Sequence, residues 1–370
     1  MNKEIKVNLK ERGYKIHVRR GLLKQVGPEI KRVSKAEKIL LLSIPKVWEK
    51  YGRMVLNGLS KSFKQAEVFL IPDGEVHKNE KVLFSVFKKL KDLRFQKDSC
   101  LAALGGGVVG DLGGLAASLY MRGIDFVQVP TTLLAQVDAS IGGKTAVDFQ
   151  GIKNLVGAFY QPKVVLIDPD TLKTLDDRQM RTGLAEIIKC GIIQDEKLFE
   201  SIEKNINLFF DRDPQFLSSL ICRSGLIKAR IISEDEREGG KRMWLNYGHT
   251  LGHAFESYYG YQRLTHGEAI AYGMWAASLM SHWMGLCTAE TARRQYALLK
   301  VAGLFKPVPK FEKERVYQKM LLDKKARSGQ IQFVLTRKIG LVTIQKNVEK
   351  SLIFSALNRL QTEMPQPSFN

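Results

Sequence analysis

Cysteine is scarce in this chain, with 4 residues among 370. Cys100, Cys190, Cys222 and Cys287 lie far apart and form no Cys-x-x-Cys pair. Small extracellular domains and zinc ribbons depend on closely spaced cysteines, so this spacing argues against both a disulfide framework and a zinc ribbon. The four residues are predicted to be isolated, reduced core residues.

Long apolar runs are also absent. No stretch of about 18 apolar residues occurs, so no membrane span is predicted. The N-terminal sequence runs directly into an alternating strand pattern and lacks the apolar core of a signal peptide. Together with 44% hydrophobic residues, these features predict a cytosolic globular enzyme, and the length favours two domains.

Acidic residues are outnumbered. The chain has 58 Lys and Arg against 38 Asp and Glu, a net charge of +20. Such a charge can indicate nucleic-acid binding, and a nucleic-acid-binding or regulatory protein is the alternative of a different class. The basic residues are spread along the whole chain, however, without a basic tail or interleaved aromatic residues. This distribution favours a generally basic surface that attracts a small anionic substrate by long-range steering.

The first half of the chain alternates apolar strand patterns with amphipathic helices. Strands are predicted at residues 5–7, 14–18, 38–43, 67–71, 100–104, 126–130 and 164–167, and helices at 47–59 and 82–93. This alternation predicts an α/β domain with a doubly wound, mostly parallel, Rossmann-like sheet, which we place over residues 1–171.

The pattern changes from about Leu172. Helical spacing follows at 179–193, 217–236, 250–259, 268–284 and 289–302, with a small hairpin predicted from 332–334 and 341–344. We therefore predict an all-α domain over residues 172–362. The last eight residues, 363–370, include two prolines and are expected to be a disordered tail.

Three of the 6 histidines, His249, His253 and His266, fall within the 23 residues from 246 to 268. Three imidazoles on one helix and the following loop suggest a catalytic metal. The alternative is a structural role, as half-buried helix histidines that bind no metal. The i, i+4 spacing alone selects His249 and His253 as ligands. Thr250 stands where a zinc-protease helix carries its glutamate, so that hydrolytic mechanism is unsupported.

A glycine-rich turn follows the strand predicted at 100–104. Residues 105–107 are all glycine, Gly110 follows, and a helix is expected to begin near Asp111. Glycines allow a phosphate to approach the main chain at a helix N-terminus, as in dinucleotide-binding turns. The spacing Gly-Gly-Gly-x-x-Gly differs from the usual fingerprint, so a tight strand-to-helix turn without a ligand remains an alternative.

Further downstream, residues 143–145 (Gly-Lys-Thr) are like the end of a P-loop. No glycine occurs near Ala139, where a P-loop requires one, so a nucleoside-triphosphatase is rejected. Lys144, Lys153 and Asn154 remain candidates for binding phosphate or carboxylate.

Glu186 and Lys189 lie three residues apart in a predicted helix and share one face. A surface ion pair is the ordinary interpretation of that spacing. The neighbouring residues are apolar, which indicates that this face is at least partly buried.

These segments together resemble 3-dehydroquinate synthase, of the sugar-phosphate cyclase group. The resemblance extends from about residue 73 to 339 and rests on blocks in the same order: residues 105–114, 120–144, 151–162, 184–189, 245–253, 266–270 and 323–325. It implies two domains with the active site in the cleft between them, and a homodimer.

The resemblance also implies an activity. 3-Deoxy-D-arabino-heptulosonate 7-phosphate would be converted to 3-dehydroquinate and phosphate, in the shikimate pathway to chorismate and the aromatic amino acids. NAD would be used transiently, with zinc or cobalt as the divalent metal. The alternatives are another sugar-phosphate cyclase, which makes an inosose or a valiolone, and a metal-dependent polyol dehydrogenase.

Site residues are carried over by position. The resemblance implies that Glu186, His249 and His266 are the metal ligands, in disagreement with the bare spacing. Substrate hydroxyls and protons would be handled by Asp138, Lys189, Asn246 and His253, and the anionic groups by Lys144, Asn154, Arg242 and one of Lys324 and Lys325. Arg122 would reach the site of the partner subunit.

The resemblance likewise implies a cofactor site. NAD would lie along Asp73, Gly74, Glu75, Lys78, Gly106, Gly107, Val108, Asp111, Thr131, Thr132, Lys144, Lys153, Thr171, Leu172, Lys173 and Thr174. One position departs from the pattern, because Ile44 stands where the family usually has Asp or Asn. Ile44 cannot accept a hydrogen bond from the adenosine ribose, so weaker NAD binding or a substitute contact is expected.

Overall fold

The computed structural model describes residues 2–307, 310–322 and 331–362. Its internal contacts divide the chain into two compact units. The first, which we call the sheet unit, comprises Met1–Leu175 and Arg212–Ser233; the second, the helical unit, comprises Asp176–Asp211 and Glu234–Asn370. The helix at 214–234 is thus grouped almost entirely with the sheet, although it follows the first three helices of the helical unit in the chain.

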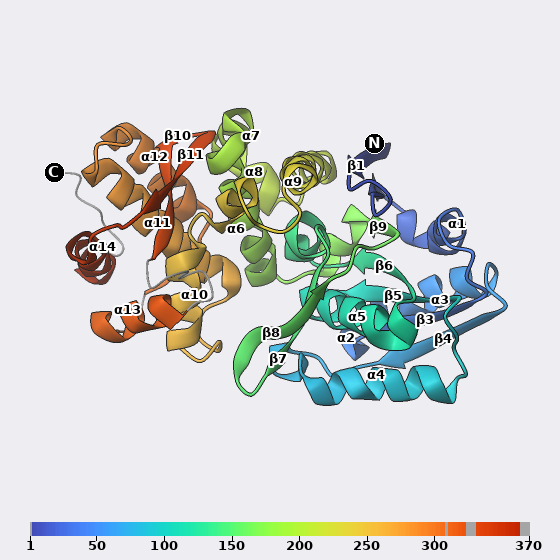
Figure 1. Cartoon of the computed structure of the whole chain (residues 1–370). Helices are drawn as coiled ribbons and strands as arrows, with labels where there is room; N and C mark the ends of the chain where they lie inside the picture. The colour runs from blue at the N-terminus through green and yellow to red at the C-terminus, as the bar shows by residue number, and fades with distance from the viewer. Residues whose placement is uncertain (1, 308–309, 323–330, 363–370) are drawn as a thin grey trace. The chain divides into compact units, whose positions relative to one another are not determined.

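The sheet unit is built on seven strands in the order β1-β2-β9-β6-β5-β3-β4 (Figure 1). The strands are β1 (Asn2–Val7), β2 (Tyr14–Arg19), β3 (Lys38–Ser43), β4 (Gln65–Leu70), β5 (Ser99–Gly105), β6 (Asp125–Pro130) and β9 (Val164–Ile167). Only β1 and β2 pair in antiparallel fashion; the other pairs are parallel. The predicted class, a mostly parallel α/β sheet, is confirmed.

Helices cover both faces of this sheet because its central strands are apolar on both sides. In β3, Leu40 and Leu42 pack with side chains of α4 and α5, whereas Ile39 and Leu41 pack with those of α1 and α3. The helices of this unit are α1 (Val26–Lys31), α2 (Pro45–Val47), α3 (Arg53–Ser60), α4 (Glu80–Asp92), α5 (Gly107–Leu119) and α9 (Pro214–Glu234).

The helix after the glycine-rich turn begins earlier than predicted. α5 starts at Gly107, with Gly106 as its N-cap residue, so Asp111 lies inside the helix and not at its start. A Cβ added at Gly106 would lie 3.1 Å from the Thr132 side chain, and one at Gly110 would lie 2.7 Å from Gln128. The glycines therefore let α5 pack closely on the sheet, which favours helix here despite their low propensity.

The sheet unit also contains a hairpin that was not predicted from the sequence. β7 (Lys144–Phe149) and β8 (Ile152–Phe159) pair in antiparallel fashion and form a separate two-stranded sheet. Most of β8 is exposed, so it lacks the alternation of buried and exposed residues by which a strand is usually recognised.

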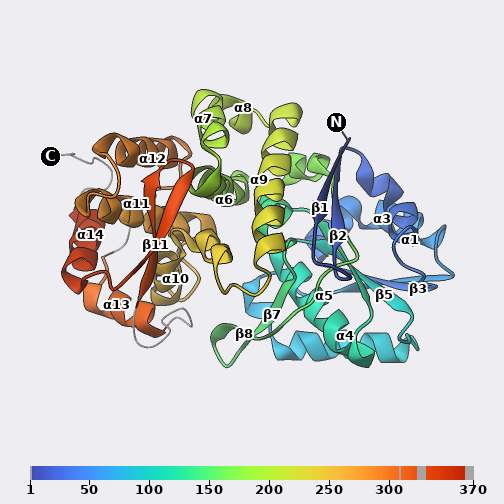
Figure 2. The same ribbon diagram turned by 45° about the horizontal axis from the view of Figure 1, so that its top comes forward.

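The helical unit contains α6 (Asp177–Gln194), α7 (Glu196–Lys204), α8 (Ile206–Phe210), α10 (His249–Tyr258), α11 (His266–Trp283), α12 (Ala289–Val301), α13 (Lys313–Leu322) and α14 (Lys350–Thr362). The expected late hairpin is present as β10 (Gln332–Lys338) and β11 (Leu341–Lys346) (Figure 2). α11 is the buried central helix, with its residues from Gly267 to Ser281 all buried. The helix-rich character predicted for this part of the chain is confirmed.

The helices α10 and α11 meet at glycines. A Cβ at Gly273 would lie 1.8 Å from the carbonyl oxygen of Gly248, and one at Gly252 would lie 3.0 Å from the backbone of Ile270. Gly248 also has a φ of 78°, a conformation that favours glycine. The two helices therefore pack backbone against backbone, with the N-terminal end of α10 against the middle of α11.

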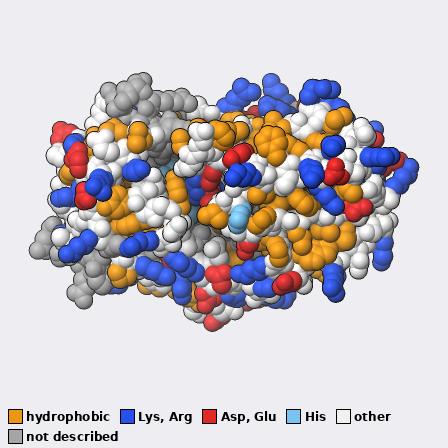
Figure 3. Space-filling model, turned by 90° about the horizontal axis from the view of Figure 1, so that it is seen from below, with side chains coloured by type: hydrophobic (Ala, Val, Ile, Leu, Met, Phe, Trp, Pro, Cys, Tyr) orange, Lys and Arg blue, Asp and Glu red, His pale blue; other side chains and the backbone are white. Residues whose placement is uncertain are grey.

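The sequence-based expectations for cysteine and charge can be compared directly with the structure. All four cysteines are buried and form no disulfide bond, and burial raises the pKa of Cys287 to about 11. On the face shown in Figure 3, Lys and Arg side chains are scattered among acidic and apolar ones and do not form one basic patch. Among the described residues, no helix is both long and apolar enough to span a membrane.

Candidate functional site

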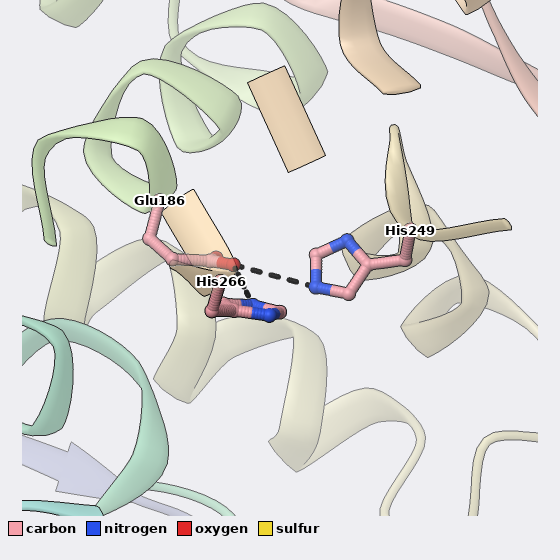
Figure 4. A group of neighbouring side chains, drawn as sticks. All are labelled: Glu186, His249 and His266. Carbon is pink, nitrogen blue, oxygen red and sulfur yellow. Dashed lines mark hydrogen bonds and ion pairs between the residues drawn. The ribbon is translucent and has the colours of Figure 1, made fainter. Parts of the chain in front are cut away.

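Three side chains distant in the sequence converge in the helical unit. Glu186 lies in the middle of α6, and His249 and His266 are the first residues of α10 and α11. The Oε1 atom of Glu186 is 3.3 Å from Nε2 of His249 and 3.3 Å from Nε2 of His266 (Figure 4). One carboxylate and two imidazoles that face each other are a donor set suited to a divalent transition metal.

Each imidazole is oriented by an oxygen atom that faces its Nδ1. Nδ1 of His249 lies 3.1 Å from the carbonyl oxygen of Tyr247, which can only accept a hydrogen bond. Nδ1 of His266 lies 3.2 Å from Oε2 of Glu256. Each Nδ1 therefore carries a proton toward its partner, and Nε2 is the nitrogen that faces Glu186.

The ionisation of the cluster follows from its burial. Burial, together with Lys189, lowers the pKa of His249 to about 3, so this imidazole is neutral. Burial alone would lower the pKa of His266 as well, but Glu256 and Glu186 outweigh it and raise that pKa to about 10. A metal ion that binds here must displace the proton on Nε2 of His266.

Lys189 belongs to the same buried group. Its ammonium forms an ion pair with Oε2 of Glu186, and both side chains are 1% exposed. Burial alone would raise the pKa of Glu186, but Lys189 and the two imidazoles hold it well below its ordinary value. The helical spacing of these two residues therefore marks a buried pair and not a surface one.

His253 lies beside the cluster but belongs to a different set. Its ring centroid is 5.2 Å from that of His249, and its ligand atom groups with those of Glu256 and His266 within 4.8 Å. The pair selected by i, i+4 spacing is thus not the pair that faces Glu186. The set taken from the resemblance, Glu186, His249 and His266, is one of two that the fold brings together, and its role as the ligand set remains a prediction.

Arg242 and Asn246 lie in a short 3-10 helix, Lys241–Asn246, and the loop that leads into it is organised by one carboxylate. Asp235 accepts hydrogen bonds from the backbone N–H groups of Gly239 (3.0 Å), Gly240 (2.7 Å) and Arg242 (3.0 Å). Arg242 is 2% exposed and its guanidinium donates to the carbonyl of Glu236.

The amide of Asn246 donates to Glu238 at 2.6 Å. Asp235 was not singled out from the sequence. Its three amide partners are close in the chain, but acidic loop residues are too common for that pattern to be a signal.

Asp138, in the sheet unit, has a partner that the sequence analysis missed. Nζ of Lys228 in α9 lies 2.6 Å from Oδ1 of Asp138 and 2.6 Å from its carbonyl oxygen. The Lys228 side chain is only 9% exposed. Ile221, Ser224 and Ile231, at helical spacing from Lys228, are all 0% exposed, so a lysine on an apolar helix face was the available signal.

The candidate cofactor residues of the sheet unit include a buried ion pair. Nζ of Lys78 lies 2.5 Å from Oδ2 of Asp111 in α5 and 2.5 Å from Oδ1 of Asn154 in β8. Burial alone would lower the pKa of Lys78, but Asp111 and Glu75 raise it above its ordinary value. Burial in turn raises the pKa of Asp111.

Lys153 extends this group, because its Nζ is 3.2 Å from Oε1 of Glu75. Four predicted cofactor residues thus lie in one charged group with Asn154: Lys78, Glu75, Asp111 and Lys153.

The remaining candidate cofactor residues fall into two places. Gly106, Gly107 and Val108 lie at the start of α5, next to Thr131 and Thr132. Asp73 and Gly74 are exposed in the loop that follows β4. The hydroxyl of Thr171 accepts from Gln136 at 2.9 Å and donates to the carbonyl of Asp168 at 2.8 Å.

Near Thr171, Thr174 hydrogen-bonds Tyr51 at 2.7 Å, Lys173 pairs with Asp170 at 2.9 Å, and Leu172 is buried. The side chains of residues 171–174 are therefore engaged within the sheet unit itself.

Three other candidates complete the set. Lys144 begins β7 and is exposed, and Arg122 is exposed at the end of a short turn with a φ of 61°. Lys324 and Lys325, together with the tail expected to be disordered, lie outside the described residues.

Known sequences and structures are similar to the whole of this chain. The family described as 3-dehydroquinate synthase N-terminal matches residues 68–182, and 3-dehydroquinate synthase C-terminal matches residues 183–326. The 3-dehydroquinate synthase of Microcystis aeruginosa is 44% identical over 356 residues, which cover 96% of this chain and 97% of that protein.

Two solved structures share the fold. The 2-epi-5-epi-valiolone synthase of Streptomyces hygroscopicus subsp. jinggangensis, with NAD+ and Zn2+ bound, has a TM-score of 0.87 at 29% identity and covers 95% of this chain and 98% of its own. A 2-deoxy-scyllo-inosose synthase, complexed with carbaglucose-6-phosphate, NAD+ and Co2+, has a TM-score of 0.87 at 26% identity, with 98% and 99% covered. On the sequence matches, which span most of its length, this chain is a member of the 3-dehydroquinate synthase family.

Proposed function

We propose that this protein converts 3-deoxy-D-arabino-heptulosonate 7-phosphate to 3-dehydroquinate and phosphate. The observation that carries the proposal is the buried cluster of Glu186, His249 and His266, in a chain 44% identical to a 3-dehydroquinate synthase over nearly its full length. A structural role alone would not favour two imidazoles aimed at one carboxylate, because burying ionisable groups is costly.

The chain provides a fitting place for each cofactor. Glu186, His249 and His266 would hold the divalent metal, zinc or cobalt, and the network around Lys78 and the turn before α5 would hold NAD. When bound, NAD accepts and returns a hydride at a ring alcohol, and the metal polarises the oxygen of that alcohol.

The other side chains act on the substrate directly. Lys144, Asn154 and Arg242 would bind its phosphate and carboxylate, since a guanidinium and ammonium groups match those anions. Asp138, Lys189, Asn246 and His253 would orient hydroxyls and move protons. Lys228 holds the Asp138 carboxylate in place at 2.6 Å, so we add it to this set.

Two properties of the working protein are also part of the proposal. We propose that it acts in the cytoplasm, which agrees with four buried cysteines that form no disulfide bond. We further propose a homodimer, in which Arg122 reaches the site of the partner subunit, as the family resemblance implies.

The decisive test is phosphate release by the purified protein. The assay supplies the heptulosonate phosphate, zinc and a catalytic amount of NAD, and follows absorbance at the NADH band. We expect phosphate release without accumulation of NADH, because the hydride returns to the substrate in each turnover. EDTA should abolish the release and added zinc should restore it.

Other results would point to the alternatives. NADH that accumulates without phosphate would indicate a polyol dehydrogenase. Activity confined to another sugar phosphate, such as glucose 6-phosphate, whose carba-analogue occupies the inosose synthase structure, would indicate a different cyclase. Either outcome would overturn the proposed substrate.

Ile44 provides a separate prediction about NAD affinity. It is the N-cap residue of α2, makes no side-chain capping bond, and is 8% exposed against the core. Replacement of Ile44 by Asp should tighten NAD binding about fivefold, since one added hydrogen bond contributes about 1 kcal/mol. The new cap contributes about 1 kcal/mol of stability, against about 2 kcal/mol lost with the buried isoleucine.

Titration of NAD by protein fluorescence measures the effect of Ile44→Asp. Ile44→Val is the matched control, because it keeps the apolar contact and adds no acceptor. Equal NAD affinity in the Asp variant and the wild type would show that another contact already replaces the missing one.

A further inference from the structure

The two imidazoles of the cluster are held by unlike acceptors. A neutral backbone carbonyl, that of Tyr247, accepts from His249, whereas a carboxylate, that of Glu256, faces His266. Any residue at position 247 would supply a backbone carbonyl, whereas a carboxylate at position 256 requires an acidic side chain. Glu256 thus makes a specific contact with His266, although the proposed reaction gives Glu256 no role.

Glu256 is built into the site by the helix that carries His249. His249, His253 and Glu256 have i, i+4 and i+7 spacing in α10, so they share one face. The side chain of Glu256 is 6% exposed, and its Oε2 lies 3.2 Å from Nδ1 of His266. A carboxylate this deeply buried is costly unless its charge is used by a partner.

His266 thereby lies between two carboxylates. Its Nε2 faces Oε1 of Glu186 at 3.3 Å and its Nδ1 faces Oε2 of Glu256 at 3.2 Å. The two contacts on opposite nitrogens fix both the rotation of the ring and its tautomer. An anionic acceptor also draws the Nδ1 proton more strongly than a carbonyl does, which makes Nε2 a better electron donor.

We propose that Glu256 is a positioning residue for the metal centre: it fixes the ring of His266 and strengthens His266 as a ligand. The inference rests on the proposed function, because it assumes that Glu186, His249 and His266 hold a divalent metal. It adds an asymmetry to that site, in which His266 is the stronger of the two imidazole donors.

The geometry favours this role over direct ligation by Glu256. Glu256, His253 and His266 form a second set of ligand atoms within 4.8 Å of one another. An ion bound in that set would need a free lone pair on Nδ1 of His266, where the proton toward Glu256 lies. One nitrogen cannot both donate a proton and bind a cation, so we assign Glu256 to orientation.

The test measures metal binding and not turnover. Affinity for Zn2+ is determined by competition with a chromogenic chelator in the wild type, Glu256→Gln and Glu256→Asp. We expect the Gln variant to bind Zn2+ about 10- to 100-fold more weakly, the range found when such supporting groups are removed. The Asp variant keeps the charge but draws it back by one methylene, so an intermediate loss is expected.

A spectroscopic readout separates positioning from folding. The visible absorption bands of bound Co2+ report ligand strength and geometry, and we expect Glu256→Gln to shift them while thermal unfolding remains cooperative. Glu312→Gln is the matched control: it removes the same charge from the helical unit, at a side chain that is 64% exposed and pairs with Arg315. That variant should match the wild type in affinity and spectrum.

The outcomes distinguish the inference from the function on which it rests. Wild-type affinity and an unchanged Co2+ spectrum in both Glu256 variants would overturn the positioning role and leave the proposed function intact. Two metal ions per wild-type chain, with one lost in Glu256→Gln, would overturn it in favour of direct ligation. A wild type that binds neither metal would overturn the proposed function and the inference together. If the Gln variant fails to fold, the Asp variant decides.

Discussion

Replacement of Glu186 by Gln is expected to lower the rate of phosphate release about 1000-fold. The change removes the only anionic member of the proposed ligand set and keeps its size. Loss of metal-assisted charge stabilisation of about 4 kcal/mol corresponds to that factor. Zinc should restore activity to EDTA-treated wild type but not to the variant. Single-turnover phosphate release and the zinc content of the protein measure the effect.

Glu186→Gln is also expected to lower the stability of the protein, so the experiment needs a second variant. Glu186→Gln leaves the ammonium of Lys189, 1% exposed, without its anionic partner. Removal of one member of a buried pair costs about 3–5 kcal/mol, whereas replacement of both can be nearly neutral. The double variant Glu186→Gln/Lys189→Met should therefore recover stability without recovering activity.

Glu203→Gln serves as the control for Glu186→Gln, since Glu203 pairs with Arg294 in the same helical unit, at 2.6 Å. Its activity should stay within about twofold of the wild type, because screened pairs of this kind contribute less than about 1 kcal/mol. A Glu186→Gln variant that retains zinc and a rate within tenfold of the wild type would contradict the assignment of this carboxylate.

Lys78→Met is expected to have the largest effect in the sheet unit. The ammonium of Lys78 is 4% exposed and joins Asp111 of α5 to Asn154 of β8 at 2.5 Å each. Its loss leaves the carboxylate of Asp111 uncompensated, at a cost of about 3 kcal/mol, so Tm should fall by roughly 6–12 °C. NAD affinity should fall as well, because Lys78 and Asp111 belong to the proposed cofactor site.

The pH dependence follows from the direction of the Lys78 shift. Folding raises the pKa of Lys78. Its contribution to stability is therefore fully present below the pKa of an unfolded lysine and is lost only as the pH rises through the folded value. The Tm difference between wild type and Lys78→Met should accordingly persist across neutral pH.

A double-mutant cycle tests whether the pair itself is responsible. Lys78→Met/Asp111→Leu should regain much of the lost stability, but not NAD affinity. Lys81→Met is the matched control, since Lys81 is exposed near the start of α4. If the double variant were as unstable as the sum of its two single variants, the coupling between Lys78 and Asp111 would be absent.

Elements with a strong hydrophobic pattern were predictable to the residue. β3 and β9 have the predicted bounds, Lys38–Ser43 and Val164–Ile167, because continuous apolar runs between polar segments leave little choice of register. β8 was not predicted because most of its residues are exposed, and α5 was misplaced because its glycines conceal a helix that is stabilised by packing.

The residues of the candidate site could be predicted from the sequence more readily than the contacts between them. The three histidines stood out by their scarcity, but i, i+4 spacing chose His253 in place of His266. The contact between His266 and Glu186 joins residues 80 apart in sequence, and no local pattern encodes it. Lys228 lies 90 residues from Asp138, so its pairing too depends on tertiary structure alone.

The glycine contact between α10 and α11 has a consequence for ion size. His249 and His266 begin these two helices, and the helices touch where a Cβ at Gly273 would lie 1.8 Å from the Gly248 carbonyl. This close backbone contact holds the two helices against each other and so limits how far the two imidazoles can move apart. Zinc binds nitrogen at about 2.0–2.1 Å, while calcium needs about 2.3–2.6 Å and more oxygens. The proposed metal site is therefore expected to favour a small ion such as zinc over a larger one such as calcium.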